Sequence, residues 1–435
     1  MKKLLSLLLV LTISLTACGK KETTTSDASN NDANASRYAN VEPNNSEITI
    51  WHSYTKAQEE ALTNSVEKFN AENGLGIKVK LESQDSKGFE GKVKQAIRAG
   101  NGPDLIIHFS TAAAEYVRDD LVVDFEELIA NEKFGIPNYL DGVNPNTIKE
   151  VDGFTDGKMH VFPLVSSGPI FFYNQDLYNE LGLSAPKTWN DVFANAEKIK
   201  AAHPDKYGFA ADSLPDYAQT LISQNNNGEV FNKELKTTFA TNEKVIAAVA
   251  KYGEAVSKGL YMNAPTGQYF SEDFNSGLLA SYIGSVAGVP YISLPNLGLA
   301  PMPQTEGGTP FTPAWNRGAI VFKSTPEKEL AAFLFVKHFA SPEQNALFCK
   351  AANYISPYSA TREHQIYQDF IKDAKGLEHL QAEIAGAYAP VSGTSSLRED
   401  LKAALSEVAG GIKDAKTALS DAATSADMHL AESNQ

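Results

Sequence analysis

The chain has 435 residues, of which 43% are hydrophobic and 21% are charged, and its 22 Phe and 17 Tyr can fill sizeable cores. This composition is that of a globular protein, and the length suffices for two domains of ordinary size. The formal net charge of −15 argues against nucleic acid as a partner and against adhesion to anionic lipid through basic patches.

The first 17 residues have the pattern of a secretory signal peptide. Lys2 and Lys3 precede an apolar run from Leu4 to Leu15, which is too short to cross the ~30 Å hydrocarbon core of a bilayer as a helix. The following Leu15-Thr16-Ala17-Cys18-Gly19 resembles the lipobox of bacterial lipoproteins, in which the cysteine carries lipid and becomes the first mature residue. The resemblance implies lipidation at Cys18 and an extracytoplasmic protein anchored to the cell membrane. An ordinary signal peptide with a chance cysteine is the alternative.

Residues 18–46 are expected to hold the lipidated cysteine and a flexible tether. From Gly19 to Ser46 the chain is rich in Thr, Ser, Asn, Asp and Ala, so it buries too little apolar surface to offset the entropy of ordering. A random coil of this length spans roughly 30 Å. The other cysteine, Cys349, lies on an apolar helical stretch and is expected to be buried and inert. With Cys18 lipidated, it would have no disulfide partner.

Strand-like and helical patterns alternate in the next sixty residues. Period-2 alternation or short apolar runs predict strands, and apolar spacing of three or four predicts helices. The expected strands are 47–51, 77–81 and 105–107, and the expected helices are 56–70 and 89–99. This order predicts βαβ units, a largely parallel sheet and an α/β lobe.

A second α/β lobe is expected to begin near Phe162. Strand segments are predicted at 162–165 and 170–173, a helix from the Thr188 region to about Ala202, and shorter α/β stretches at 207–210 and 278–283. The last third is predicted to be helical, with helices at 326–339, 397–408 and 413–430. We assign the N-terminal lobe to residues 47–162 plus 285–340 and the C-terminal lobe to residues 163–284 plus 341–435.

Short motifs occur in a fixed order along nearly the whole expected mature chain. They are Trp51-His52-Ser53, Gly102-Pro103-Asp104, Phe172-Tyr173-Asn174, Thr188-Trp189-Asn190-Asp191, Phe274-Asn275-Ser276-Gly277 and Asn353-Tyr354-Ile355-Ser356-Pro357. In order and spacing they resemble extracellular solute-binding protein family 1, the maltodextrin-binding-like subunits of ABC importers. The resemblance implies a two-lobed periplasmic-binding-protein fold of type II, with an interlobe cleft and hinge crossings. It also implies a small polar solute as ligand, transmembrane permease subunits as partners, and no cofactor.

Within that family, Trp51-His52-Ser53 and Ser166-Ser167 are most similar to the glycerol-3-phosphate-binding proteins. That pattern implies ligand contacts at Ser167, near Ser285, at Gly318 and at Tyr354. Two features depart from it: the position after the third strand, acidic in the subgroup, is Ser110, and no arginine occurs from Ala387 to Ser396. A sugar or oligosaccharide is therefore the expected ligand. Glycerol 3-phosphate, a glycerophosphodiester or another sugar phosphate is the alternative.

Further candidates follow from the rule that ligands of open α/β sheets bind beyond the carboxyl ends of strands. Serines that follow strand-like segments are Ser53, Ser110, Ser167 and Ser285. Aromatic candidates for the C–H faces of a sugar are Trp51, Tyr54, Tyr282, Trp315 and Tyr354, each of which also suits a core. Trp315 is favoured because it lies in a polar stretch, Thr312 to Gly318. Arg317 in the same stretch is suited to a phosphate or carboxylate, with a surface ion pair as the alternative.

Enzymes and adhesins are the rival classes. The eight histidines are scattered and none shows His-Glu-x-x-His spacing. Gly284-Ser285-Val286-Ala287-Gly288 places serine directly after the first glycine, so the geometry of a Gly-x-Ser-x-Gly nucleophile elbow is absent. We expect no enzymatic activity, and a secreted hydrolase is the remote alternative. A surface adhesin would lack a deep cleft for a small ligand.

Overall fold

The computed structural model describes residues 36–139, 141–267 and 269–434, and the chain from Arg37 onward forms one compact unit. The predicted signal peptide and Cys18 lie outside the described residues. No helix in the described part combines the length and apolarity needed to cross a bilayer.

The larger sheet forms the centre of the N-terminal lobe and has the strand order β2-β1-β3-β9-β4. Its strands are β1 (Glu47–His52), β2 (Lys78–Ser83), β3 (Leu105–Phe109), β4 (Phe162–Ser167) and β9 (Trp315–Val321). β1 pairs in parallel with both β2 and β3, as the βαβ pattern predicts. β9 runs antiparallel to β3 and to β4. The first residues of β9 therefore lie at the edge where β1 and β3 end.

Helices with an apolar face cover this sheet. They are α1 (Lys56–Glu72), α2 (Phe89–Arg98), α3 (Ser110–Arg118), α4 (Phe125–Ile129), α5 (Pro145–Val151), α11 (Pro326–Phe339), α12 (Pro342–Ala352), α13 (Ser359–Glu363) and α14 (Gln365–Asp373). α11 begins with proline, as expected, because the first helical N–H needs no intrahelical partner. Leu330, Phe333 and Phe339 of α11 are fully buried in the core beneath it. Cys349 is a buried free thiol in that core, as predicted.

The smaller sheet has the order β6-β5-β7 and is antiparallel. Its strands are β5 (Pro169–Asn174), β6 (Ser281–Ser285) and β7 (Leu297–Ala300), and a separate short pair joins β8 (Thr312–Pro313) to β10 (Ala385–Gly386). The surrounding helices are α6 (Gln175–Glu180), α7 (Trp189–Ala202), α8 (Leu214–Asn225), α9 (Glu243–Ser257) and α10 (Phe270–Asn275). Short 3₁₀ turns lie at η1 (Val286–Tyr291), η2 (Leu377–His379) and η3 (Ala382–Ile384). α7 begins with a capping box between Thr188 and Asp191, which explains the helix start seen in the sequence.

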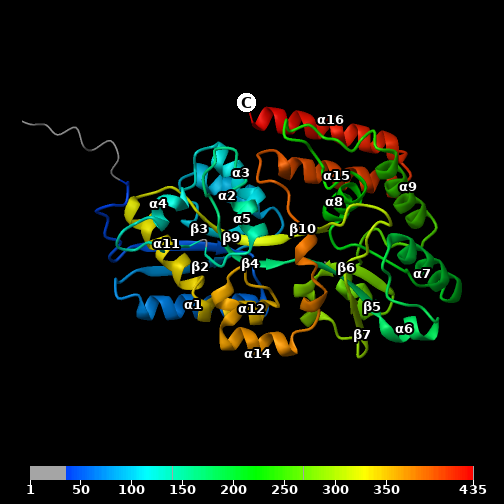
Figure 1. Cartoon of the computed structure of the whole chain (residues 1–435), viewed down its shortest axis with the longest axis horizontal. Coiled ribbons are helices and arrows are strands. Elements are labelled where there is room, and N and C mark those ends of the chain that lie inside the picture. The colour runs from blue at the N-terminus through cyan, green and yellow to red at the C-terminus, as the bar shows by residue number, and fades with distance from the viewer. Residues whose placement is uncertain (1–35, 140, 268, 435) are drawn as a thin grey trace, which may run out of the picture. The chain divides into compact units, whose positions relative to one another are not determined.

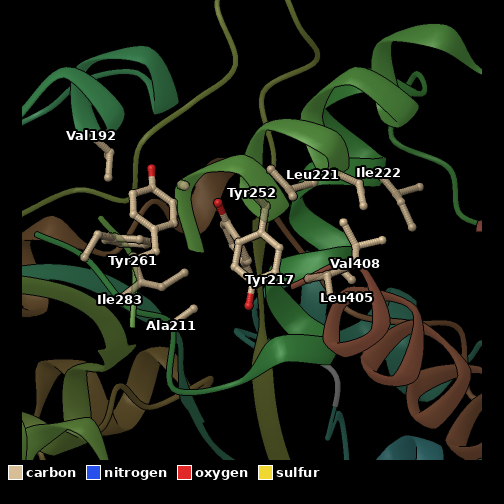
Figure 2. Close-up of a cluster of buried hydrophobic side chains, with 14 of the residues drawn as sticks. Val192, Ala211, Tyr217, Leu221, Ile222, Tyr252, Tyr261, Ile283, Leu405 and Val408 are labelled. Atoms are coloured by element: carbon tan, nitrogen blue, oxygen red, sulfur yellow. The ribbon is translucent and has the colours of Figure 1, made fainter. Parts of the chain in front are cut away.

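Two C-terminal helices complete this lobe. α15 (Thr394–Ala409) and α16 (Ala415–Ser433) pack on each other and on α9, and α15 also packs on α8 (Figure 1). Leu405 and Val408 of α15 join a core of aromatic and aliphatic side chains from α8, α9 and the smaller sheet, part of which Figure 2 shows. The expected helices at 397–408 and 413–430 are thus present, each slightly longer than the apolar pattern.

Three assignments of segments to lobes were wrong. Residues 163–167 of β4 are expected in the C-terminal lobe, yet β4 pairs with β9 in the larger sheet. β7 is expected in the N-terminal lobe, yet it pairs with β5 in the smaller sheet. Residues 341–373 are also expected in the C-terminal lobe, but α12 packs on α1 and β4 of the N-terminal lobe. α13 and α14 in turn pack on α12. The chain therefore crosses between lobes near Gly168, near Thr312–Trp315, and between α14 and α15.

The segment that precedes β1 also differs from expectation. Tyr38 is buried against the larger-sheet core, and its hydroxyl donates to Glu329 Oε2 at 2.6 Å. Arg37 pairs with Glu329 Oε1 at 2.8 Å, and Asn131 Nδ2 donates to the carbonyl oxygen of Tyr38 at 2.9 Å. Residues 37–46, assigned to the flexible tether, are therefore packed on the N-terminal lobe.

Candidate functional site

A cavity of about 480 Å³ lies beyond the edge of the larger sheet where β1 and β3 end and β9 begins. Ser53 follows β1, and Ser110 is the first residue of α3 directly after β3. Trp315 and Arg317 come from the start of β9, and Arg317 lies opposite Phe109 in the register. All four residues line the cavity. The sheet thus places side chains of three strands at one site.

The C-terminal lobe supplies the opposite wall of this cleft cavity. Its lining residues there include Asp216, Gln219, Tyr388, Ser395 and Arg398. α8 carries the first two and α15 carries the last two. A solute in the cavity would therefore contact both lobes.

The lobes also touch each other directly beside the cavity. Glu115 of α3 accepts hydrogen bonds from Gly393 N at 2.7 Å and Ser392 Oγ at 3.0 Å. Gly393 is the N-cap residue of α15, so a carboxylate meets the positive end of that helix dipole. Ser395 Oγ donates to Glu90 Oε2 at 3.4 Å. These bonds join the two walls on one side of the cleft.

A half-buried carboxylate, that of Glu150, organises the N-terminal wall. Glu150 of α5 accepts a hydrogen bond from Ser110 Oγ at 2.7 Å and another from Asn316 Nδ2. Burial raises the pKa of Glu150 to about 7, while these two hydrogen bonds act in the opposite direction. The group holds a carboxyl, a hydroxyl and an amide within reach of a solute, which is a suitable set for binding sugar hydroxyls.

Arg317 supplies a cation to the same wall. Its guanidinium lies over the rings of Phe109 and Tyr54, with 4.8 Å and 5.3 Å to the ring centroids. Among the residues that the structure describes, no carboxylate oxygen lies within 4.0 Å of its nitrogens. Nearby His108 accepts a hydrogen bond from Phe109 N, and burial, with Arg317 adding to it, lowers the pKa of this imidazole to about 3. His108 is therefore neutral at pH 7, and Arg317 is the cation of this wall.

An ion pair occupies the C-terminal wall. Both guanidinium NH₂ groups of Arg398 donate to the carboxylate of Asp216, Nη2 to Oδ2 at 3.2 Å. The Asp216 side chain is 9% exposed, and Ser213 Oγ donates to it as well. Arg398 also lies over the ring of Tyr388, 5.4 Å from its centroid. The pair joins α15 to the start of α8 at the rim of the cleft.

Seven of the residues expected at the site do not line this cavity. Trp51, Tyr54, Tyr282 and Tyr354 are buried in hydrophobic cores, although Tyr54 lies beneath Arg317. Ser285 caps the 3₁₀ helix η1, and Ser167 lines a separate cavity of only about 50 Å³. Gly318 is buried in β9, where a Cβ atom would lie 2.3 Å from Val161. An aromatic residue that follows a strand can pack in a hydrophobic core as readily as it can line a binding site, and these four aromatic residues pack in cores.

The polar stretch around Trp315 also has a different structure from the expected loop. Trp315 begins β9 and pairs with Ser167, and Thr312–Pro313 forms the short strand β8. The indole is half-buried, and its Nε1 is buried without a hydrogen-bond partner among the described residues. A strand therefore holds the ring, and its polar atom is enclosed by protein and has no accessible surface for a solute.

Sequence reasoning missed Glu150, Asp216 and Arg398. Each lies on a helix, and only the packing of that helix brings the side chain over the sheet edge. Two signals were nevertheless available. The position after the third strand, acidic in the glycerol-3-phosphate subgroup, is Ser110 here, and its hydroxyl donates to the carboxylate of Glu150. The arginine sought between Ala387 and Ser396 occurs two residues further on, as Arg398.

We expect Glu150→Gln to remove a pH-dependent cost of folding. The raised pKa means that the folded protein holds the Glu150 proton more tightly than the unfolded chain does, so this contribution to stability is lost as the pH rises through about 7. The stability of the natural protein relative to the variant should therefore fall between about pH 5 and about pH 8. Urea unfolding of both proteins measures this. Glu126→Gln, at an exposed position of α4, should parallel the natural protein, and a pH-independent gap for Glu150→Gln would contradict the assignment.

Comparison with known proteins places the chain in a family. The family model of the bacterial extracellular solute-binding protein matches residues 53–346. The sn-glycerol-3-phosphate-binding periplasmic protein UgpB of Brucella melitensis is 24% identical over 413 residues, covering 86% of this chain and 91% of that protein.

Two solved structures have the same fold. The substrate-binding protein Lmo0181 of Listeria monocytogenes, in complex with cycloalternan, aligns with a TM-score of 0.74 and 20% identity, covering 89% of this chain and 99% of that one. The cyclic alpha-maltosyl-1,6-maltose binding protein of Arthrobacter globiformis aligns with a TM-score of 0.72 and 19% identity over the same shares. The expected two-lobed α/β fold is thus confirmed. The family model covers more than half of the chain, and the chain therefore belongs to the bacterial extracellular solute-binding protein family.

Proposed function

We propose that this protein binds a sugar or oligosaccharide in the cleft cavity and delivers it to the transmembrane subunits of an ABC importer. The observation that supports this most is the combination of the half-buried Trp315 ring with the Glu150–Ser110–Asn316 group in one cavity. An aromatic face accommodates the C–H face of a sugar ring, and the carboxyl, hydroxyl and amide groups bind its hydroxyls. The structural neighbours named for maltose-type sugars and cycloalternan agree with this class of ligand.

A phosphate-bearing solute is the second candidate. Arg317 faces the cavity without a carboxylate within 4.0 Å in the described part of the chain, and a guanidinium binds phosphate through two parallel hydrogen bonds. Arg398 lines the same cavity. The relative named for sn-glycerol 3-phosphate favours glycerol 3-phosphate or a glycerophosphodiester. Four acidic side chains also line the cavity, Glu90, Glu150, Asp216 and Glu399, and they disfavour an anion, so we rank this candidate second.

Thermal shifts and calorimetry separate the two candidates. The panel contains maltotriose and other neutral oligosaccharides, glucose 6-phosphate, glycerol 3-phosphate and glycerophosphocholine, with turnover of each compound assayed alongside. We expect stabilisation by a neutral sugar that survives Arg317→Gln. Stabilisation by phosphate esters alone, abolished by Arg317→Gln, would favour the second candidate. Turnover of any compound would instead favour the hydrolase alternative.

We expect the two lobes to close around the solute. A ligand that contacts both walls favours the closed arrangement by its difference in affinity between the two states. Small-angle scattering should then give a smaller radius of gyration with the panel sugar bound than without it. Identical curves at saturation would contradict closure and favour a preformed pocket.

We also propose that the protein is a lipoprotein held at the outer side of the cell membrane through Cys18. The lipobox-like sequence after the apolar run supports this, and two or more acyl chains suffice for stable anchoring. We therefore expect Cys18→Ala to move the protein from the membrane fraction to the soluble fraction. Quantitative recovery of the variant with membranes would contradict the lipid anchor.

A further inference from the structure

A second cavity of about 480 Å³ lies within the C-terminal lobe, and it is as large as the cleft cavity. Its walls are the start of α7, the second half of α8, one face of α9 and the loop 305–309. α8 separates the two cavities. Asp216 and Gln219 of this helix line the cleft, whereas Leu221, Gln224 and Asn225 line the second cavity. A ligand there would contact one lobe only.

Aromatic side chains lie at the inner end of the second cavity, where Trp189 offers the exposed ring and Tyr217, Tyr252 and Tyr261, each 3–4% exposed, support it from the core. Trp189 is half-buried, and its ring meets that of Tyr217 edge-on at 5.2 Å between centroids. Tyr217 in turn meets Tyr252 at 5.6 Å, and Tyr252 and Tyr261 lie 6.4 Å apart. Figure 2 shows these three tyrosines as neighbours in the core of the lobe. Contacts between neighbouring rings and with the core fix the orientation of these side chains in the absence of a ligand.

One buried amide fixes the wall opposite α9. Gln224 Oε1 accepts from Trp189 Nε1 at 2.8 Å and from Thr305 N at 2.8 Å. Its Nε2 donates to the carbonyl oxygen of Phe311 at 2.9 Å. At Gly308 a Cβ atom would lie 2.4 Å from the Gln224 carbonyl oxygen, so the loop approaches α8 as closely as glycine permits. The loop and the tryptophan are thus held in one arrangement.

The rim of the second cavity is polar and carries two cations. Lys244 and Lys251 of α9 face it, separated by the small Ala247 and Ala248. Lys251 Nζ donates to Asn190 Oδ1 at 2.7 Å. Within the described chain, no carboxylate oxygen lies within 4.0 Å of either ammonium. The rim therefore offers amide groups and two ammonium groups that are not in contact with a carboxylate of the described residues, and it also carries Glu306.

We propose that the second cavity is a sugar-binding site separate from the cleft. A sugar ring has apolar C–H faces that match the aromatic wall and hydroxyl edges that match the amides and ammonium groups of the rim. An apolar peptide would remove those groups from water without partners, which is costly. An acidic ligand would meet Glu306 at the rim and the net charge of −15.

The test uses two alanines of one helix. Ala247 and Ala250 are both exposed on α9, but only Ala247 lines the second cavity. Ala247→Trp should fill the cavity without disturbing the core, and Ala250→Trp is the matched control. Saturation-transfer NMR of the full-length protein with maltotriose and the methyl glycosides of glucose, galactose and mannose reports sugar contacts at millimolar affinity.

To isolate the second site, each substitution is placed in a Trp315→Ala background, which weakens the cleft. We expect sugar signals to persist in that background, to weaken at least about tenfold with Ala247→Trp, and to be unchanged with Ala250→Trp. Loss of all signals on Trp315→Ala alone would overturn the second site and leave the cleft function standing. Absence of signals from every sugar, or equal effects of both tryptophans, would also overturn it. If Ala247→Trp abolished all sugar signals in the protein with Trp315 intact, the result would support the second site and contradict sugar binding in the cleft.

Discussion

Replacing Arg398 with alanine is expected to lower the free energy of unfolding by about 3 kcal/mol, because removal of one partner leaves a buried carboxylate uncompensated. Asp216 is 9% exposed and accepts two hydrogen bonds from this guanidinium. We take the lower end of the usual range because the Arg398 side chain remains 29% exposed. Urea unfolding without ligand measures the loss.

Lys402→Ala is the matched control on the same helix. Lys402 pairs with Glu399 at 3.0 Å, but both side chains are more than half exposed, at 51% and 70%. Such a pair contributes roughly 0–1 kcal/mol. The double variant Asp216→Asn/Arg398→Met should recover part of the loss, because it removes both charges together. If Arg398→Ala cost no more than Lys402→Ala, the pair would have no structural role and Arg398 would be available to a ligand.

Local patterns predicted the elements of the N-terminal lobe well. Period-2 alternation and helical spacing located β1, α1, β2, α2 and β3 to within a few residues, because each of these elements buries one face against its immediate neighbours in sequence. The parallel pairing followed from the βαβ order. The pairing of β9 with β3 was not foreseen, because it joins residues about two hundred positions apart.

The lobe to which a strand or helix belongs depends on contacts with residues far away in the sequence. Local sequence patterns therefore predicted lobe membership less well than they predicted the elements themselves. Nothing in Leu297–Ala300 shows whether this strand pairs with β5 or with a strand of the larger sheet. The apolar face of α12 likewise suits either core. The structure decides both cases through contacts that have no local signature.

The site was predictable only where it belongs to strand ends. The rule for open sheets predicts Ser53 and Ser110 because they follow strands, and both line the cleft cavity. Glu150 and Arg398 reach the same cavity from helices, and their positions depend on how those helices pack. Tyr282 and Tyr354 are instead buried in cores, which an aromatic residue near a strand end suits equally well.

Replacing Trp315 with alanine is expected to weaken sugar binding by roughly 1–3 kcal/mol, which is about 5- to 150-fold in dissociation constant. The half-buried ring lines the cleft and its Nε1 has no partner among the described residues. A bound sugar would cover the exposed ring face, and the variant loses this contact.

The same substitution should lower the free energy of unfolding by less than it lowers the free energy of sugar binding, because the Trp315 ring is only partly enclosed by protein. Calorimetry with the sugar identified by the panel gives the first quantity, and urea unfolding without sugar gives the second. Trp51→Phe is a suitable comparison: it changes a buried tryptophan that lines neither cavity, so it should leave the cleft affinity unchanged. A large loss of stability with unchanged affinity for Trp315→Ala would show that the indole belongs to the core of the lobe. The cleft would then bind its ligand through Glu150, Ser110 and Arg317, without an aromatic ring.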